Sequence, residues 1–148
     1  MLKINRQTDY AVRVVLALAQ REDGTRIPSS DIQREMLIPK AFMSRIVARL
    51  AHEGLVNTFP GRDGGLSLPR SASRITLKDV VEAFEGPILL SECMQVTGED
   101  DCPFQSNCPV RSKWGRVQVA MMREMASITF ESLAQEALGA PMAMTSLV

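Results

Sequence analysis

The hydrophobic positions of the N-terminal half recur at helical spacing in short, separated segments. The first segment predicts a helix over about residues 9–20, with Thr8 as its N-cap. A second, shorter helix is expected to open at Ser30, because Ser30 and Gln33 form a capping-box pattern. The pattern therefore predicts an N-terminal half built from short amphipathic helices.

Two helices are predicted in close succession between residues 30 and 54. Leu37-Ile38-Pro39 interrupts the helical pattern, and Gly54 suits the end of the helix that follows. The resulting order of helix, three-residue turn and helix is the spacing of a helix-turn-helix unit.

The second of these helices has one apolar face and one polar face. Small and polar side chains on the polar face would let the helix approach the base edges of DNA, while flanking cations would reach phosphates. The predicted DNA contacts on this helix are Lys40, Ala41, Ser44, Arg45 and Arg49. The alternative is an amphipathic surface helix with a solvated polar face, and the helical pattern alone favours neither interpretation.

The residues after this helix predict a β-hairpin. Residues 55–59 and 66–68 have strand character, and the glycine-rich turn 60–65 connects them. Such a hairpin directly after a recognition helix is typical of a wing. Arg62 at its tip would enter a DNA minor groove, where the negative potential favours a guanidinium. The alternative for Arg62 is a solvated loop residue, but the wing as a whole favours DNA binding.

The C-terminal half alternates between helical and irregular patterns. Thr76 is the predicted cap of an amphipathic helix that Gly86-Pro87 ends, and residues 91–111 show no periodicity. A long helical run with two apolar stripes extends from Trp114 to about Leu138. One such helix has more apolar surface than a small winged domain can cover. We therefore expect it to pair with a symmetry mate in a two-fold dimer, which also matches two DNA half-sites.

Together these patterns predict a mainly α-helical protein with a small β-wing. The fold class is a winged helix-turn-helix domain followed by a long C-terminal dimerisation helix, and 148 residues suffice for both. The predicted division is a DNA-binding domain over residues 1–90, a cysteine loop over residues 91–111, a dimerisation helix over residues 112–138 and a flexible tail over residues 139–148.

Composition and charge narrow the compartment and the partner. No run approaches the roughly 20 apolar residues that span a bilayer, and the first residues lack the apolar region of a secretory signal. We therefore expect a cytoplasmic protein with no membrane partner. The 17 basic and 17 acidic residues cancel, but residues 40–74 carry six basic side chains against two acidic ones. This asymmetry predicts a basic surface on the N-terminal half, as DNA binding requires.

Three cysteines, Cys93, Cys102 and Cys108, lie in the predicted loop. An odd number of cysteines in one short segment argues against a disulfide framework and favours metal binding or redox chemistry. Their spacing contains no close pair of the kind that a mononuclear zinc site uses, and it fits the corners of an iron–sulfur cluster better. The only histidine, His52, falls at the end of the recognition helix. A fourth ligand is therefore absent locally, an oxygen donor, or supplied by a partner subunit.

Several short motifs along the chain occur together in one known family. They are Thr8-Asp9-Tyr10-Ala11, Ser44-Arg45-Ile46-Val47-Ala48-Arg49-Leu50, Gly54-Leu55-Val56, Gly61-Arg62-Asp63-Gly64-Gly65, Ile75-Thr76-Leu77-Lys78-Asp79-Val80-Val81-Glu82-Ala83 and the three cysteines before a long helix. With their order along the chain, they resemble the Rrf-two family of winged-helix regulators, which includes IscR, NsrR and RirA types. The similarity extends to about residue 138.

The resemblance implies an iron–sulfur cluster held by the three cysteines, with [4Fe–4S] favoured over [2Fe–2S]. IscR-type members have a histidine three residues after the last cysteine, where this chain has Arg111. NsrR-type members use an aspartate that reaches across the dimer from the first helix, and Asp9 occupies that position. The ligand pattern therefore resembles the NsrR and RirA types most closely, with Asp9 of the partner subunit as the candidate fourth ligand. The alternative role of Asp9 is to stabilise the first helical turn.

The leading hypothesis is a homodimeric transcriptional repressor that binds a double-stranded DNA operator with two half-sites. It would sense nitric oxide, iron or redox state through the cluster. The alternative is a repressor of the same fold without a cluster, whose thiols sense oxidation by forming a disulfide. An enzyme is not expected, because the sequence has no cysteine–histidine pairing, no phosphate loop and no carboxylate pair placed for acid–base catalysis.

Overall fold

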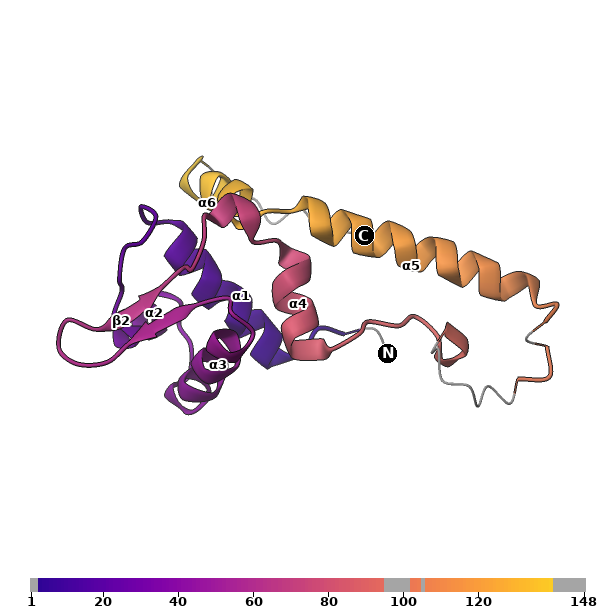
Figure 1. Cartoon of the computed structure of the whole chain (residues 1–148), viewed down its shortest axis with the longest axis horizontal. Coiled ribbons are helices and arrows are strands. Elements are labelled where there is room, and N and C mark those ends of the chain that lie inside the picture. The colour runs from indigo at the N-terminus through magenta and orange to yellow at the C-terminus, as the bar shows by residue number, and fades with distance from the viewer. Residues whose placement is uncertain (1–2, 95–101, 105, 140–148) are drawn as a thin grey trace.

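Six α-helices and a two-stranded sheet make up the part of the chain that the computed structural model describes, residues 3–94, 102–104 and 106–139. With two 3-10 turns, the elements in chain order are α1 (Arg6–Ala19), α2 (Ser29–Glu35), α3 (Lys40–His52), β1 (Asn57–Phe59), β2 (Gly65–Ser67), η1 (Ala72–Arg74), α4 (Leu77–Glu85), η2 (Glu92–Met94), α5 (Pro109–Ser127) and α6 (Phe130–Gly139). All but η2 and α5 gather at one end of the molecule, and α5 extends away from them (Figure 1). The predicted mainly α-helical fold with a small β-wing is confirmed.

Helix α1 begins earlier than the sequence predicts. Its N-cap is Asn5, whose side-chain oxygen accepts a hydrogen bond from the backbone N–H of Thr8 at 3.0 Å. Thr8 lies inside the helix and is completely buried, and its hydroxyl donates to the carboxylate of Glu85 at the end of α4. The prediction of Thr8 as the cap is therefore wrong, because a tertiary contact uses its hydroxyl instead.

The helix-turn-helix unit has the predicted spacing but a different start. Pro28 occupies the N-cap position of α2 and no side chain caps this helix, so the predicted capping box of Ser30 and Gln33 is wrong. Between α2 and α3, Leu37 adopts a φ of 53°, a left-handed conformation that a continuing helix does not allow. Gly54 has a φ of 68° just after α3 and ends that helix as predicted.

Strands β1 and β2 form the predicted antiparallel hairpin, with Phe59 opposite Gly65. Ile27 adds a short third segment to it, because its backbone exchanges hydrogen bonds of 2.9 and 2.8 Å with Leu66. Two glycines of the hairpin leave no room for a side chain. A Cβ on Gly64 would lie 2.1 Å from the backbone oxygen of Phe59, and one on Gly65, at a φ of 134°, would lie 2.6 Å from that of Ile27.

The hydrophobic core lies between α1 and the helices that surround it. Its largest fully buried apolar side chains are Phe130, Ile32, Ile46, Leu50, Ile75, Val14, Val15 and Val80. Helix α4 closes one side of this core and packs against both α1 and α3. As predicted, Thr76 caps its start and Gly86 caps its end, and the structure adds that Thr76 forms a capping box with Asp79. The core therefore fixes α3, the predicted recognition helix, on the rest of the domain.

The helix predicted over residues 112–138 is in fact two helices. Helix α5 ends at Ser127, and α6 begins at Phe130 after a short extended segment. Phe130 is completely buried, and α6 turns back to pack on α1 and η1. The prediction of one continuous helix is therefore wrong, and the last described helix packs on the winged domain.

Backbone pairing explains this break between α5 and α6. The N–H of Leu77 donates to the oxygen of Ile128, and the N–H of Phe130 donates to the oxygen of Ile75, both at 2.9 Å. Thr129 then caps α6, because its hydroxyl oxygen accepts from the backbone N–H of Ser132 at 3.2 Å. At this point backbone hydrogen bonds to residues 75–77 replace the hydrogen bonds of a continuing helix. The helical spacing of apolar residues does not predict such a break, because it carries no information about contacts with distant residues.

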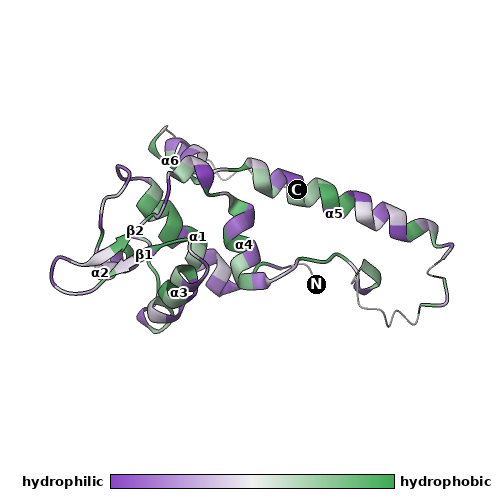
Figure 2. Cartoon of the chain, in the orientation of Figure 1, coloured by the Kyte–Doolittle hydropathy of each residue, from purple (hydrophilic) through white to green (hydrophobic). Residues whose placement is uncertain are grey.

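Helix α5 has no buried residue, unlike the other α-helices of the described chain. Hydrophobic and hydrophilic side chains alternate along its exposed length (Figure 2). Within the described residues, no helix combines the length and the apolar character needed to cross a membrane. The predicted flexible tail over residues 139–148 lies outside the described residues except for Gly139.

Candidate DNA interface and cysteine site

Helix α3 presents the polar face that the sequence predicts. Its apolar residues Met43, Ile46 and Leu50 are buried against the core. The exposed residues on the opposite face are Lys40, Ala41, Ser44, Arg45 and Ala48. Because the apolar face fixes the helix on the domain, the small and basic side chains form a rigid surface of the kind that enters a DNA major groove.

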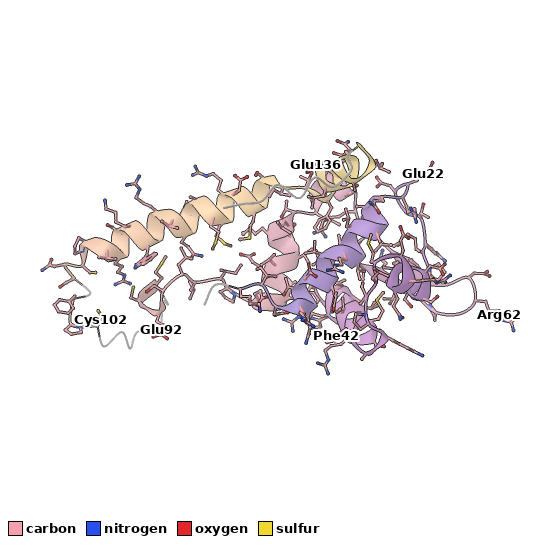
Figure 3. The ribbon with its side chains drawn as sticks, turned by 180° about the vertical axis from the view of Figure 1, so that it is seen from behind. Glu22, Phe42, Arg62, Glu92, Cys102 and Glu136 are labelled. Atoms are coloured by element: carbon pink, nitrogen blue, oxygen red, sulfur yellow. The ribbon has the colours of Figure 1, made fainter. Side chains whose placement is uncertain are left out.

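A groove of about 420 Å³ separates α3 from the wing. Its walls include Ser29 and Ser30 at the start of α2, Ser44 and Val47 of α3, and Arg62 of the wing. Figure 3 shows Arg62 on the hairpin loop that projects from the domain. The fold thus brings two of the predicted DNA-contact residues, Ser44 and Arg62, to one concave surface.

Three residues of this groove carry hydroxyl groups that the sequence analysis did not predict as DNA contacts. Ser29 and Ser30 line the α2 wall and Thr58 lines the wing wall, and all three residues are exposed. Ser30 is available for this position because it does not cap α2. The sequence does contain a signal for these contacts, because two serines begin α2. The first helix of a helix-turn-helix crosses the DNA backbone, where hydroxyl groups can bind phosphates.

Arg49, predicted to reach a phosphate, is bonded within the domain. Its Nε donates to the backbone oxygen of Ala83 in α4 at 2.9 Å and lies 3.3 Å from the carboxylate of Glu53. Arg49 therefore holds α3 against α4. Three other cations predicted to contact DNA, Lys40, Arg45 and Arg62, form no ion pair with any residue that the structure describes.

The three cysteines lie between α4 and α5 and are free thiols. Cys93 is on η2, and Cys108 is the N-cap of α5. Cys102 is exposed and lies at the end of the molecule remote from the wing (Figure 3). The described residues do not bring three such ligands into one metal-binding group. Residues 95–101, between the first two cysteines, are outside the described part.

The chemistry of these side chains fits a sulfur-ligated iron centre. All three are free thiols, and thiolates are the usual ligands of iron–sulfur clusters. Cys108 directly precedes the first turn of α5, where backbone N–H groups without helical partners favour negative charge. Cys93 and Cys108 are only partly buried and Cys102 is exposed, so incoming iron can reach each of them.

Asp9, the candidate fourth ligand, lies on the surface of α1. Its carboxylate forms an ion pair with Arg13 at 2.7 Å, and the Asp9 side chain is 52% exposed. Arg13 also donates to the backbone oxygen of Met36 at 3.4 Å. Helix α1 belongs to the winged domain, whereas Cys102 lies at the other end of the molecule (Figures 1 and 3). The described structure therefore does not bring Asp9 to the cysteines of its own chain.

A helix-turn-helix with a small and basic outer face, followed by a glycine-rich wing that carries an arginine, defines a winged-helix DNA-binding protein. Within this class the chain belongs to the Rrf2 family, the Rrf-two family that its motifs resemble. The sequence model of this family is described as an iron-dependent transcriptional regulator and matches residues 4–136. The family predicted from the motifs is confirmed, and the chain is a transcriptional regulator and not an enzyme.

Individual relatives agree with this assignment. The chain is 35% identical over 133 residues to protein aau3 of Rhizobium meliloti strain 1021, covering 89% of this chain and 84% of that protein. It is 26% identical over 132 residues to the HTH-type transcriptional regulator NsrR of Oceanobacillus iheyensis, covering 89% of each. Among solved structures, it is similar to CymR (YrzC), the global cysteine regulator of B. subtilis, with a TM-score of 0.74 and 27% identity over 91% of this chain and 98% of that one.

Proposed function

We propose that the chain is a homodimeric repressor that acts in the cytoplasm, binds an operator of two half-sites and senses nitric oxide, iron or redox state through an iron–sulfur cluster. The observation that carries this proposal is the position of the cysteines between two helices of different character. Helix α4 packs against the recognition helix α3, whereas α5 has no buried residue of its own. A cluster bound between these helices can therefore change the orientation of the DNA-binding domain relative to α5.

Operator binding is assigned to α3 and the wing. Ala41 and Ser44 leave room for α3 to approach base edges, and Arg45 suits a bidentate contact with guanine. Lys40 is expected to contact a phosphate, and Arg62 is expected to enter the neighbouring minor groove. The absence of ion pairs to these three cations within the described chain supports this assignment, because no carboxylate there competes with DNA for them.

A second copy of the chain is proposed to cover α5. Val110, Trp114 and Val117 follow one another at helical spacing along one face, and each is between 42% and 52% exposed. Two α5 helices packed together would bury these side chains and relate the winged domains by a two-fold axis. That symmetry matches an operator of two half-sites.

The cluster is proposed to be held by Cys93, Cys102 and Cys108, with Asp9 of the partner subunit as the fourth ligand. A [4Fe–4S] cluster is favoured over [2Fe–2S]. Two observations support the role of Asp9: its carboxylate is exposed, and its helix lies apart from Cys102 of the same chain (Figures 1 and 3). When bound, the cluster supplies iron that nitric oxide and oxidants attack and that is lost when iron is scarce. Arg13 must then release or share the Asp9 carboxylate.

A thiol sensor without a cluster is the second candidate. It is favoured by the three free thiols of one loop and by the exposure of Cys102. Two thiols would then be oxidised to a disulfide, with two electrons and two protons passing to a peroxide. The new bond would shorten the path between η2 and α5.

Anaerobic reconstitution with iron and sulfide distinguishes these candidates. A cluster predicts a brown protein whose visible absorption is lost in Cys102→Ala and kept in Ser106→Ala, a matched change at an exposed neighbour. A colourless wild-type protein would reject the cluster. Loss of operator binding on peroxide treatment of the metal-free protein would then support the thiol sensor. If neither nitric oxide on the reconstituted protein nor peroxide on the metal-free protein alters operator binding in gel shifts, both sensing proposals fail.

A further inference from the structure

Arg26 lies beside the wing, and its side chain stacks on an aromatic ring. Its guanidinium carbon is 3.7 Å from the centroid of the Phe59 ring at the end of β1. The next residue, Ile27, exchanges two backbone hydrogen bonds with Leu66 of β2. Both the backbone beside Arg26 and its side chain are therefore held by the wing, and the stacking itself is a cation–π contact.

Phe59 connects Arg26 to the groove between α3 and the wing. Phe59 lines this groove together with Ser44 and Arg62, whereas Arg26 is outside the lining. Arg26 therefore contacts a residue that borders the groove without lining the groove itself. Arg62 is on the projecting loop of the hairpin (Figure 3), and Arg26 is beside the strands from which that loop extends.

Arg26 differs from the neighbouring arginines because no carboxylate of the described residues pairs with it. It is exposed and forms no ion pair within the described chain. The arginines before and after it in sequence are both paired: Arg21 with Glu35 at 3.0 Å and Arg34 with Asp31 at 2.7 Å. A guanidinium fixed by a ring instead of a carboxylate keeps its charge and its N–H donors available for an external anion.

We propose that Arg26 is a further DNA-contact residue that binds a backbone phosphate at the edge of the wing, and that Phe59 positions it. The inference rests on the proposed role of the groove in operator binding. The ring occupies one face of the guanidinium, so the in-plane N–H donors remain for a bidentate contact with phosphate. Such a contact carries no sequence information. Arg26 therefore adds affinity for any duplex and fixes the orientation of the wing.

The test compares variants in the full-length protein, using an operator duplex and an unrelated duplex over a range of KCl concentrations. Arg26→Ala should weaken binding to both duplexes by about tenfold and reduce the slope of log K against log salt by about 1. Arg21→Ala is the matched control, because it removes the same charge from the segment that precedes α2 while Arg26 stays in place. It should change the affinity less than twofold, within the ordinary range for a screened surface charge.

Two more variants separate charge from position. Arg26→Lys keeps the charge but loses the planar fork, so we expect the wild-type salt slope with about threefold weaker binding. Phe59→Leu keeps an apolar side chain but removes the stacking face, and it should likewise weaken binding without lowering the slope by a full unit. Thermal unfolding curves check that Arg26→Ala, a change at an exposed residue, leaves the fold intact.

The outcomes are distinguishable. If wild-type protein binds the operator and Arg26→Ala behaves like Arg21→Ala, the inference about Arg26 is wrong and the proposed function stands. If Arg26→Ala loses affinity for the operator alone, Arg26 reads bases and the phosphate assignment is wrong. If wild-type protein binds neither duplex, in both the metal-free and the reconstituted state, the proposed function fails together with the inference.

Discussion

Helices α1 and α5 are both long and amphipathic, yet α1 has six buried residues and α5 has none. Helix α1 lies at the centre of the core and packs against α2, α3, α4 and α6, whereas α5 packs mainly against α4 and η2. The winged domain is therefore stabilised by its own contacts. In the proposed function, the position of α5 depends in addition on the second copy that its exposed face meets and on the cluster that the cysteines hold. The following predictions test this difference, from the largest expected effect to the smallest.

Phe130→Ala should destabilise the protein most, because Phe130 is completely buried where α6 returns to the winged domain. We expect a loss of about 3–5 kcal/mol in the free energy of unfolding. Val119→Ala is the matched change on α5, where the side chain is 56% exposed, and it should cost less than about 0.5 kcal/mol. Urea unfolding at a concentration where both proteins are monomeric measures the two values. Equal losses would contradict the contrast between the two regions.

Val117→Asp should instead act on association. It places a charge on the exposed apolar face of α5, so the dimer dissociation constant should rise at least about tenfold, which equals about 1.4 kcal/mol. Leu138→Asp on α6 is the control, because Leu138 is even more exposed but lies outside α5. Sedimentation equilibrium gives the dissociation constants. An unchanged dimer in Val117→Asp would show that another surface joins the two copies.

Glu85→Gln should cost about 1 kcal/mol of stability near neutral pH. Burial raises the pKa of Glu85, but hydrogen bonds from Thr8 and Asn5 outweigh it, so the pKa lies below its usual value of 4.5. A carboxyl group with a lowered pKa in the folded state stabilises the fold above its unfolded pKa, and this contribution is lost as the pH falls through the lowered value. The unfolding free energies of wild type and variant should therefore converge below pH 4.5. A pH-independent difference would mean that the charge is not responsible.

Asp9→Ala should have the smallest effect on the metal-free protein. The Asp9–Arg13 pair is exposed and one helical turn apart, so its loss should change the unfolding free energy by less than about 0.5 kcal/mol. The same variant should lose the visible absorption of the reconstituted protein faster than wild type under a chelator. Asp31→Ala, which removes the similarly exposed partner of Arg34 on α2, provides the comparison. Equal rates of loss in all three proteins would exclude Asp9 as a ligand.

The winged domain could be predicted from the sequence because local signals specify most of it. Apolar periodicity identified the buried face of α3, and Gly54 marked the end of that helix through its positive φ. The cap at Thr76 was equally visible, since a capping box uses residues three apart. Thr8 was misassigned because its hydroxyl bonds to Glu85, which is remote in sequence.

The break between α5 and α6 could not be predicted for the same reason. Residues 75–77 and 128–130 form it by backbone pairing, and a helical pattern of apolar residues continues across it in the sequence. The groove was predicted only in part: Ser44 and Arg62 were identified by residue type, but Arg49 proved to bond to α4, and Ser29, Ser30 and Thr58 were not recognised. The cysteine ligands remain a prediction, because the described residues do not bring the three thiols into one group and residues 95–101 lie outside the described part of the chain.

The pairing of residues 75–77 with residues 128–130 also gives α5 a mechanical character. One end of α5 is joined to the winged domain by this pairing, and the side chain of Gln118 in the middle of α5 bonds to the backbone of Ile88 and Leu90 after α4. The other end of α5 continues into the loop of residues 91–111 that carries the cysteines. With 19 residues, α5 is a rod about 28 Å long. For a rod of that length, a rotation of about 10° around the end joined to the winged domain moves the other end by about 5 Å. The cysteine loop therefore joins α5 at the end farther from the winged domain, where a change in the span of the loop has its largest leverage on the direction of the helix.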